Sequence, residues 1–368
     1  MLTLLLFVAG LAGLVLGASA LVRGASRLAL RLGLSPLVVG LTVVAFGTSA
    51  PELAVSSGAA AAGQAALAVG NVVGSNVFNV LFILGLSALI TPLAVHRQVI
   101  RQEVPVMIGA GLLVTALGWD GSYGLFDGAL LVLLLIGYTV FLVVKSRADN
   151  GATSVDLPLP AAGEAAAWDS RLPFQIALIG IGLVLLVAGS QAFVSAAVQV
   201  ARTMGVSEVV IGLTIVAAGT SLPEVGASIM ASLKGERDIA VGNVIGSCVF
   251  NLLGVLGVSA LVAPLSGQAM LLLPPEVAGF DLWVMLAAFL ACLPVLLTNR
   301  EIARWEGGLF LAYYVAYTSY LVLAAQRHVG TEAFADAMFG FFVPLSVVTA
   351  MVLWSRRRQL VDQTRRWP

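Results

Sequence analysis

The stretch Gly47-Thr48-Ser49-Ala50-Pro51-Glu52 occurs a second time in this chain as Gly219-Thr220-Ser221-Leu222-Pro223-Glu224. Each copy places a carboxylate, two hydroxyl groups and a proline in the middle of a long apolar run. An ionisable side chain at such a position is costly, so it marks a functional site by default. The two stretches therefore predict where the chemistry of the protein lies, and the rest of the chain is interpreted around them.

The composition indicates a membrane protein. The 368 residues are 60% hydrophobic and 10% charged, with a mean hydropathy of +1.02. Soluble domains carry about 25% charged residues. A soluble chain of this length could not bury so much apolar surface, so lipid must be the solvent. No basic or aromatic pattern indicates nucleic acid, and Cys248 and Cys292 lie in apolar runs, which favours packed thiols over a disulfide.

The hydropathy pattern predicts an all-α polytopic protein with eleven membrane spans. The expected spans are 2–22, 34–62, 67–92, 104–118, 123–145, 174–201, 206–233, 239–265, 281–298, 306–325 and 334–354. The polar segment 146–173 reads as a cytoplasmic linker, because its acidic residues lack the spacing of a calcium loop. The predicted parts are a first half (1–145), this linker, a second half (174–325) and an extra helix with a basic tail (326–368).

The basic residues predict the orientation of the chain. Arg23, Arg27 and Arg31 follow the first apolar run and none precedes it, which favours a retained helix over a signal peptide. With the N-terminus outside, 17 of the 19 Lys and Arg fall in cytoplasmic segments, and Arg202 and Arg327 are the exceptions. This bias supports the span count and its direction, with a cytoplasmic C-terminus if there are eleven spans.

The chain also contains an inverted repeat. Residues 33–89 align without gaps on residues 205–261, at an offset of 172. That offset covers five predicted spans, an odd number, so the second copy must cross the membrane in the opposite direction. Inverted repeats with polar interruptions at mid-span are typical of secondary transporters, whose site lies at the interface between the repeats.

The prolines of the two motifs predict an interruption of each helix. Pro51 and Pro223 have no backbone N–H, so the carbonyl four residues earlier, on Gly47 or Gly219, loses its partner. Free carbonyls at this depth are tolerated where they line a polar cavity. We also expect Thr48 and Glu52, four residues apart, to share a helix face, as their counterparts in the second copy would.

The repeated polar residues predict a single site made of oxygen atoms. It would comprise both glutamates, the adjoining hydroxyls and two Ser/Asn pairs four residues apart: Thr48, Ser49, Glu52, Ser75, Asn79, Thr220, Ser221, Glu224, Ser247 and Asn251. Such a donor set suits hard cations such as Ca²⁺ or Na⁺ rather than zinc or copper. Two carboxylates neutralise one Ca²⁺ and repel each other when empty, so another cation must replace Ca²⁺ as it leaves.

These motifs, together with Gly70-Asn71-x-x-Gly74-Ser75 and its copy Gly242-Asn243-x-x-Gly246-Ser247, resemble the two alpha-repeats of the sodium/calcium exchanger family. The resemblance implies ten helices in two inverted five-helix halves, with Na⁺ and Ca²⁺ competing for one central cluster. It also implies alternating access with three Na⁺ exchanged for one Ca²⁺ and no cofactor. The carbonyls of Ala45 and Ala217 would join the ligands, and Asn79 would lie at the centre of the cluster.

Two departures from the family pattern bear on the ions. Asn251 stands where some members carry Asp, which lowers the charge of the site and argues against potassium dependence; the eleventh span is also additional. Proton-coupled relatives carry Gly-Asn-x-x-Glu in place of Gly-Thr-Ser-x-Pro-Glu, so sodium coupling is favoured over proton coupling. A passive cation channel is a further alternative. An enzyme is disfavoured, because the site has no nucleophile–base pair. We expect a prokaryotic inner-membrane protein without an obligate protein partner.

Overall fold

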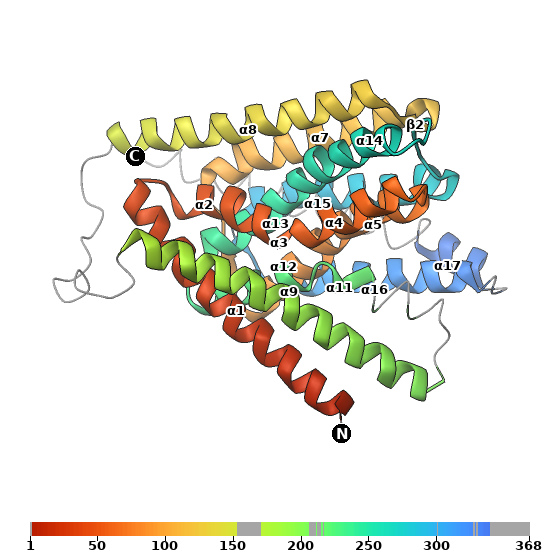
Figure 1. Cartoon of the computed structure of the whole chain (residues 1–368), viewed down its shortest axis with the longest axis horizontal. Coiled ribbons are helices and arrows are strands. Elements are labelled where there is room, and N and C mark those ends of the chain that lie inside the picture. Colours follow the sequence, from red (N-terminus) through yellow and green to blue (C-terminus); the bar gives the residue numbers. More distant parts are fainter. Residues whose placement is uncertain are drawn as a thin grey trace, which may run out of the picture.

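The computed structural model describes residues 2–152, 171–205, 211, 215, 217–299, 301–326, 328 and 330–338. These residues form a bundle of helices with two short strand pairs (Figure 1). The elements of the first part of the chain are α1 (Leu2–Leu32), α2 (Pro36–Val39), the π-helix η1 (Gly40–Val44), α3 (Ala45–Thr48), α4 (Ala50–Ala61), α5 (Ala65–Val77), the π-helix η2 (Phe78–Leu84), α6 (Gly85–Ile90), β1 (Leu93–Ala94), the π-helix η3 (Val99–Glu103), α7 (Val104–Leu117), the 3₁₀-helix η4 (Gly118–Asp120), β2 (Ser122–Tyr123) and α8 (Leu125–Ala152).

The second part repeats much of this order. Its elements are α9 (Leu172–Thr203), α11 (Ala217–Gly219), α12 (Leu222–Leu233), α13 (Arg237–Phe250), the π-helix η7 (Asn251–Val255), α14 (Leu256–Leu265), β3 (Leu271–Leu272), the π-helix η8 (Val277–Asp281), α15 (Leu282–Asn299), β4 (Glu301–Ile302), α16 (Arg304–Ala325) and α17 (Thr331–Ala337). The bounds of α12 are those of α4 shifted by 172 residues, the offset of the sequence repeat.

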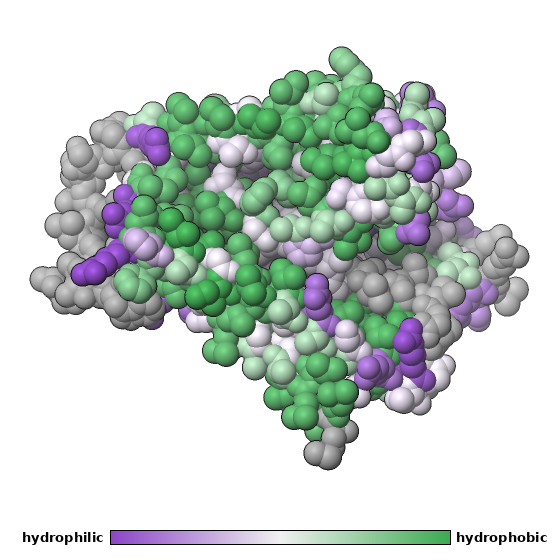
Figure 2. Space-filling model, viewed as in Figure 1, coloured by the Kyte–Doolittle hydropathy of each residue, from purple (hydrophilic) through white to green (hydrophobic). Residues whose placement is uncertain are grey.

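The membrane class is confirmed. Among the described residues, seven helices are long and apolar enough to cross a membrane, and a bent pair, Pro36–Thr48 with Ala50–Ala61, adds an eighth span. The space-filling view shows hydrophobic side chains over the middle of this face, while hydrophilic ones gather mainly toward its left and right edges (Figure 2). Such an apolar band with polar ends is the surface that a bilayer solvates.

The two helices that follow the motifs form the centre of the bundle. In the spans Ala65–Ile90 and Arg237–Leu265, 72% of the apolar window is buried, against 17% for Leu125–Ala148. Their π-helical turns begin at Phe78 and at Asn251. π-helical turns within α-helices are rare and are frequent at functional sites.

The helices α1 and α9 lie side by side in opposite directions along one flank of the bundle (Figure 1). Glycines allow their backbones to touch: a Cβ on Gly17 would lie 2.8 Å from the carbonyl oxygen of Gly182, and one on Gly10 would lie 2.8 Å from that of Gly189. Gly182 and Gly189 are themselves the repeat counterparts of Gly10 and Gly17. This close contact is typical of small-residue interfaces between membrane helices.

The strand pairs join the two parts of the chain crosswise. β1 pairs antiparallel with β4, with Leu93 opposite Ile302, and β2 pairs antiparallel with β3, with Ser122 opposite Leu272. Each pair therefore takes one strand from each half of the chain.

The structure corrects several predicted boundaries. α8 continues past the predicted span 123–145 to Ala152, and α9 starts at Leu172, before the predicted span 174–201, so both helices extend into the predicted linker 146–173. The span predicted at 104–118 starts earlier, with the π-helix η3. Of the predicted span 334–354, the residues from 339 onward lie outside the described part of the chain, as do 153–170 of the linker and several residues of the span 206–233.

Candidate ion-binding site

The first motif interrupts its span, as its proline predicts. α3 ends at Thr48, Ser49 has the backbone angles φ −85° and ψ 8°, and α4 starts at Ala50 with a bend of 46° between the two segments. The expectation that Thr48 and Glu52 share one helix face is wrong, because the break separates them. Thr48 closes one segment and Glu52 lies in the first turn of the next.

The second motif repeats this geometry. Ser221 has φ −90° and ψ 7°, α12 starts at Leu222, and Glu224 lies in its first turn. The carbonyl of Gly219, which the proline deprives of its helical partner, accepts a hydrogen bond of 2.6 Å from the Ser190 hydroxyl of α9. Both carboxylates therefore sit at the N-terminus of a half-helix, where the helix dipole favours negative charge.

The serines and glutamates of the two motifs are joined crosswise. The Ser49 hydroxyl donates to Glu224 Oε1 over 2.9 Å, and the Ser221 hydroxyl donates to Glu52 Oε1 over 2.8 Å. All four side chains are fully buried. The two halves of the repeat thus meet at one place, as the sequence predicts.

Helix α5 adds a third side chain to this cluster, since Ser75 lies 3.2 Å from the Ser221 hydroxyl, oxygen to oxygen. Asn79 follows one turn later in η2, and Ser247 and Asn251 take the corresponding places in α13 and η7. Ala45 and Ala217, predicted to act through their carbonyls, are the first residues of α3 and α11.

Many oxygen atoms of these side chains have no protein partner. Within the described residues, no hydrogen bond reaches Glu52 Oε2, Glu224 Oε2, Ser247 Oγ or either amide atom of Asn79 and Asn251, although all are buried. Buried polar atoms without partners are rare in proteins and require an explanation. The predicted donor set therefore fits a hard cation, which would take carboxylate, amide and hydroxyl oxygens as ligands.

The carboxylate content of the cluster is low. In the part of the chain that the structure covers, no group of three or more His, Cys, Asp or Glu side chains could hold a metal ion. Two carboxylates with neutral oxygens suit an ion that is bound and released, whereas zinc sites are built from Cys, His and carboxylate ligands.

Two asparagines that the sequence analysis assigned no role form a second layer behind the motifs. Thr48 Oγ1 donates to Asn243 Oδ1 over 3.1 Å, and Asn243 Nδ2 donates to Ser228 Oγ over 2.9 Å. At the equivalent positions of the repeat, Thr220 donates to Asn71 over 3.3 Å and Asn71 donates to Ser56 over 2.9 Å. The signal was present in the sequence, since Asn71/Asn243 and Ser56/Ser228 recur at the offset of 172.

Two further acidic side chains lie outside this cluster, each bonded to a tyrosine. Tyr138 donates to buried Glu103 over 2.5 Å, and Tyr317 donates to Asp281 over 2.8 Å. Each acid closes a π-helix, η3 or η8, and each bond joins that π-helix to a helix later in the chain, α8 or α16. These pairs brace neighbouring helices and do not contribute to the candidate site.

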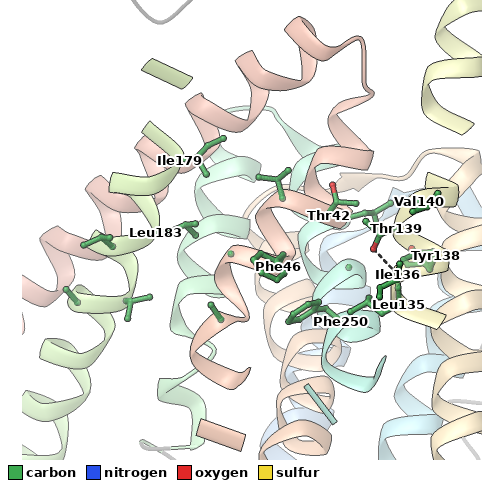
Figure 3. Close-up of a pocket in the computed structure, with 18 of the residues that line it drawn as sticks. Thr42, Phe46, Leu135, Ile136, Tyr138, Thr139, Val140, Ile179, Leu183 and Phe250 are labelled. Atoms are coloured by element: carbon green, nitrogen blue, oxygen red, sulfur yellow. Dashed lines mark hydrogen bonds between the residues drawn. The ribbon is translucent and has the colours of Figure 1, made fainter. Parts of the chain in front are cut away.

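An apolar crevice of about 930 Å³ lies behind the first motif (Figure 3). α8, α9 and the first broken span line it, and Phe46 and Phe250 meet edge to face at a centroid distance of 5.2 Å. The residues that line it in the described part of the chain are mostly apolar and include no carboxylate, which sets it apart from the glutamate cluster. Gly47 and Ala50 form part of its wall, which places it next to the break in the helix.

The fold and the site define a class: a polytopic helical transporter whose inverted repeats enclose buried oxygen atoms, rather than an enzyme. Comparison with known proteins gives the family. The profile described as "Sodium/calcium exchanger protein" matches residues 2–144 and 174–323. The chain belongs to the sodium/calcium exchanger family.

Individual relatives agree with this assignment. The chain is 41% identical over 266 residues to the "Putative antiporter CaxA" of Alkalimonas amylolytica, covering 70% of this chain and 79% of the relative. It is 33% identical over 279 residues to the "Sodium/calcium exchanger MaX1" of Methanosarcina acetivorans, covering 68% and 78%. A solved structure of the sodium-calcium exchanger NCX_Mj superposes with a TM-score of 0.72 at 30% identity, covering 87% of this chain and 99% of that one.

Proposed function

We propose that this protein exchanges Na⁺ for Ca²⁺ at the site where its two motifs meet. The observation that carries the proposal is the pair of buried glutamates, each bonded through one oxygen to a serine of the opposite motif. Among the described residues, the other oxygen of each glutamate has no partner. A cation bound to these two oxygens would contact both halves of the repeat at once.

Charge balance favours exchange over one-way transport. One Ca²⁺ or two Na⁺ would neutralise the two carboxylates, whereas the empty site would hold two like charges in a buried place. Opening toward either side would therefore be favourable with ions bound and costly without them. A third Na⁺, which the family resemblance implies, would make exchange with one Ca²⁺ electrogenic.

The coupling ion is supported by the motif and by the relatives. Both copies read Gly-Thr-Ser-x-Pro-Glu, the sodium-type pattern, and the relative from Methanosarcina acetivorans is named a sodium/calcium exchanger. NCX_Mj is likewise named a sodium-calcium exchanger. Proton/calcium exchange and a passive cation channel are the alternatives that the experiment below separates.

We assign the moving elements to α1 and α9. They lie together on one flank, and glycines bring their backbones into direct contact, so the pair can move as one unit. Sliding of this pair past the central helices would open the site to one side and then to the other. The site would lie in a prokaryotic inner membrane, with the N-terminus outside, as the distribution of basic residues predicts.

The experiment is ⁴⁵Ca²⁺ uptake into proteoliposomes that contain the purified protein. Vesicles are loaded with Na⁺, with K⁺, or with acidic buffer, and diluted into medium without Na⁺. We expect uptake in Na⁺-loaded vesicles alone, and protein-free vesicles are the control. Uptake driven by acid would replace the proposal with proton exchange, and uptake in every vesicle would indicate a channel.

A further inference from the structure

The asparagines behind the two motifs have a role of their own. This inference rests on the proposed function. Asn243 is fully buried, and all of its polar atoms are engaged. Its Nδ2 donates to the backbone oxygen of Glu224 over 3.3 Å and to the Ser228 hydroxyl over 2.9 Å. Because a backbone oxygen can only accept, the amide orientation is fixed, and Oδ1 must face Thr48.

This orientation determines where the hydroxyl hydrogen of Thr48 goes. Hydroxyls within helices ordinarily donate back to a carbonyl of their own helix. Thr42, in the same span, does so to Val38 over 2.6 Å. The Thr48 oxygen lies 3.4 Å from the Ala45 carbonyl but 3.1 Å from Asn243 Oδ1, so its hydrogen points toward the asparagine.

Two acceptors are thereby kept available. The Ala45 carbonyl accepts the backbone N–H of Ser49 over 3.0 Å and retains a second lone pair. The lone pairs of the Thr48 hydroxyl likewise remain, since its hydrogen is directed away from them. A cation needs acceptors, and a hydroxyl that pointed its hydrogen into the cavity would repel it.

The equivalent contact behind the second motif is longer and less buried. Thr220 donates to Asn71 over 3.3 Å, and Asn71 is partly exposed, whereas Asn243 is fully buried. Asn71 Nδ2 donates to Ser56 over 2.9 Å. Each motif therefore has an asparagine behind it, and the one behind Thr48 is the more deeply buried.

We propose that Asn243 and Asn71 are positioning residues of the ion site. They accept the hydroxyl hydrogens of Thr48 and Thr220 and thereby present oxygen lone pairs to the cation. Each asparagine belongs to the opposite half from the threonine that it orients. Cation affinity thus depends on two asparagines that are not themselves ligands.

The test is a double-mutant cycle on Ca²⁺ affinity, measured by equilibrium ⁴⁵Ca²⁺ binding to the purified full-length chain. Loss of an outer partner of a metal ligand typically weakens affinity about 10- to 100-fold. We expect Asn243→Leu and Thr48→Val each to weaken binding in this range, and the double variant to bind about as weakly as the weaker single variant. Asn71→Leu should have a smaller effect.

Ser232→Ala is the matched control, because the Ser232 hydroxyl is buried and donates to a carbonyl of its own helix over 2.8 Å. It should bind Ca²⁺ within about twofold of the parent. Additive losses in the cycle, or parent-like affinity of Asn243→Leu, would overturn the inference. If Asn243→Leu does not fold, as judged by size-exclusion chromatography, the cycle is run with Asn71→Leu and Thr220→Val under the same criteria.

Ca²⁺ binding by the parent protein shows whether a failure concerns the proposed function or only the positioning role. If the parent does not bind Ca²⁺, or binds it equally after Glu52→Gln, the proposed function fails. If the parent binds Ca²⁺ through Glu52 but the cycle is additive, the positioning role alone fails.

Discussion

At the scale of single residues, the candidate ion site is defined by buried oxygens that lack protein partners. Glu52 and Glu224 each use one carboxylate oxygen to accept a serine hydroxyl and leave the other without a partner among the described residues. Glutamine has the same shape but no charge, and its amide nitrogen cannot accept. The role of each carboxylate can therefore be tested without changing the volume of the site.

We expect Glu52→Gln and Glu224→Gln each to abolish exchange while the protein remains folded and inserted. Either change leaves one carboxylate for a divalent ion, so ⁴⁵Ca²⁺ uptake by Na⁺-loaded vesicles should fall at least about 100-fold. Size-exclusion chromatography controls for folding. Transport retained by either variant would mean that the site is misassigned.

A hydroxyl outside the ion cluster also has a measurable role. The Ser190 hydroxyl satisfies the carbonyl of Gly219 that Pro223 leaves without a helical partner. Ser190→Ala should destabilise the protein by about 1–3 kcal/mol, the usual cost of a buried polar group left unpaired. Thermal unfolding in detergent measures this, with Ser232→Ala as the comparison. Equal stabilities of the two variants would argue against the role of Ser190.

The residue scale also shows what the sequence could predict. The motif residues and their convergence follow from the repeat, because identical polar stretches in inverted halves must meet if the halves pack together. The role of Asn243 does not follow, because it depends on three contacts with two other helices, α3 and α12. A single asparagine in a membrane helix is equally consistent with helix packing. Its repetition at the offset of 172 was the feature of the sequence that could have indicated a role.

At the scale of elements, the contact between α1 and α9 leaves no room for added volume at Gly182. A Cβ on Gly182 would lie 2.7 Å from the backbone nitrogen of Leu21 and 2.8 Å from the oxygen of Gly17. The neighbouring atoms belong to backbone, so the helices themselves would have to separate. On the same helix, a Cβ on Gly180 would meet nothing within 4 Å in the described structure.

This difference gives a matched pair of substitutions. We expect Gly182→Ala to lower the rate of Na⁺-driven Ca²⁺ uptake at least about tenfold, because forced backbone contacts misalign the two helices. Gly180→Ala should transport within about twofold of the parent. Similar rates for both variants would contradict the assignment of α1 and α9 as a closely packed moving pair.

Element boundaries were the less predictable part of the fold. Hydropathy located the spans that the structure describes, but the start of η3 and the continuation of α8 to Ala152 were not anticipated. The π-helical turns at Phe78 and Asn251 have no local sequence signature. η2 contacts the half-helix α12 and η7 contacts the half-helix α4, and a local stretch of sequence does not specify such contacts.

At the scale of the whole molecule, the inverted repeat predicts that corresponding loops face opposite sides of the membrane. Gln64 and Glu236 occupy equivalent positions, 172 residues apart, between a motif half-helix and the next central helix. The chain has two cysteines, both buried, so a single introduced cysteine can be labelled selectively. Labelling from one side of the membrane therefore measures whether the two halves have opposite orientations.

We expect Gln64→Cys to react with a membrane-impermeant maleimide in intact cells or right-side-out vesicles. Glu236→Cys should react only after the membrane is permeabilised, because the basic residues Lys234 and Arg237 of its loop predict a cytoplasmic location. The unaltered protein is the control for background labelling. Reaction of both cysteines from the same side would contradict the inverted topology.

If one site binds Na⁺ and Ca²⁺ alternately, the fluxes of the two ions must be coupled, and both can be measured at the same time. Proteoliposomes loaded with ²²Na⁺ are diluted into ⁴⁵Ca²⁺, and the two isotopes are followed in the same vesicles. We expect Na⁺ efflux that requires external Ca²⁺, Ca²⁺ uptake that requires internal Na⁺, and loss of both fluxes in Glu52→Gln. Ca²⁺ uptake that continues without Na⁺ efflux would contradict alternate binding at one site.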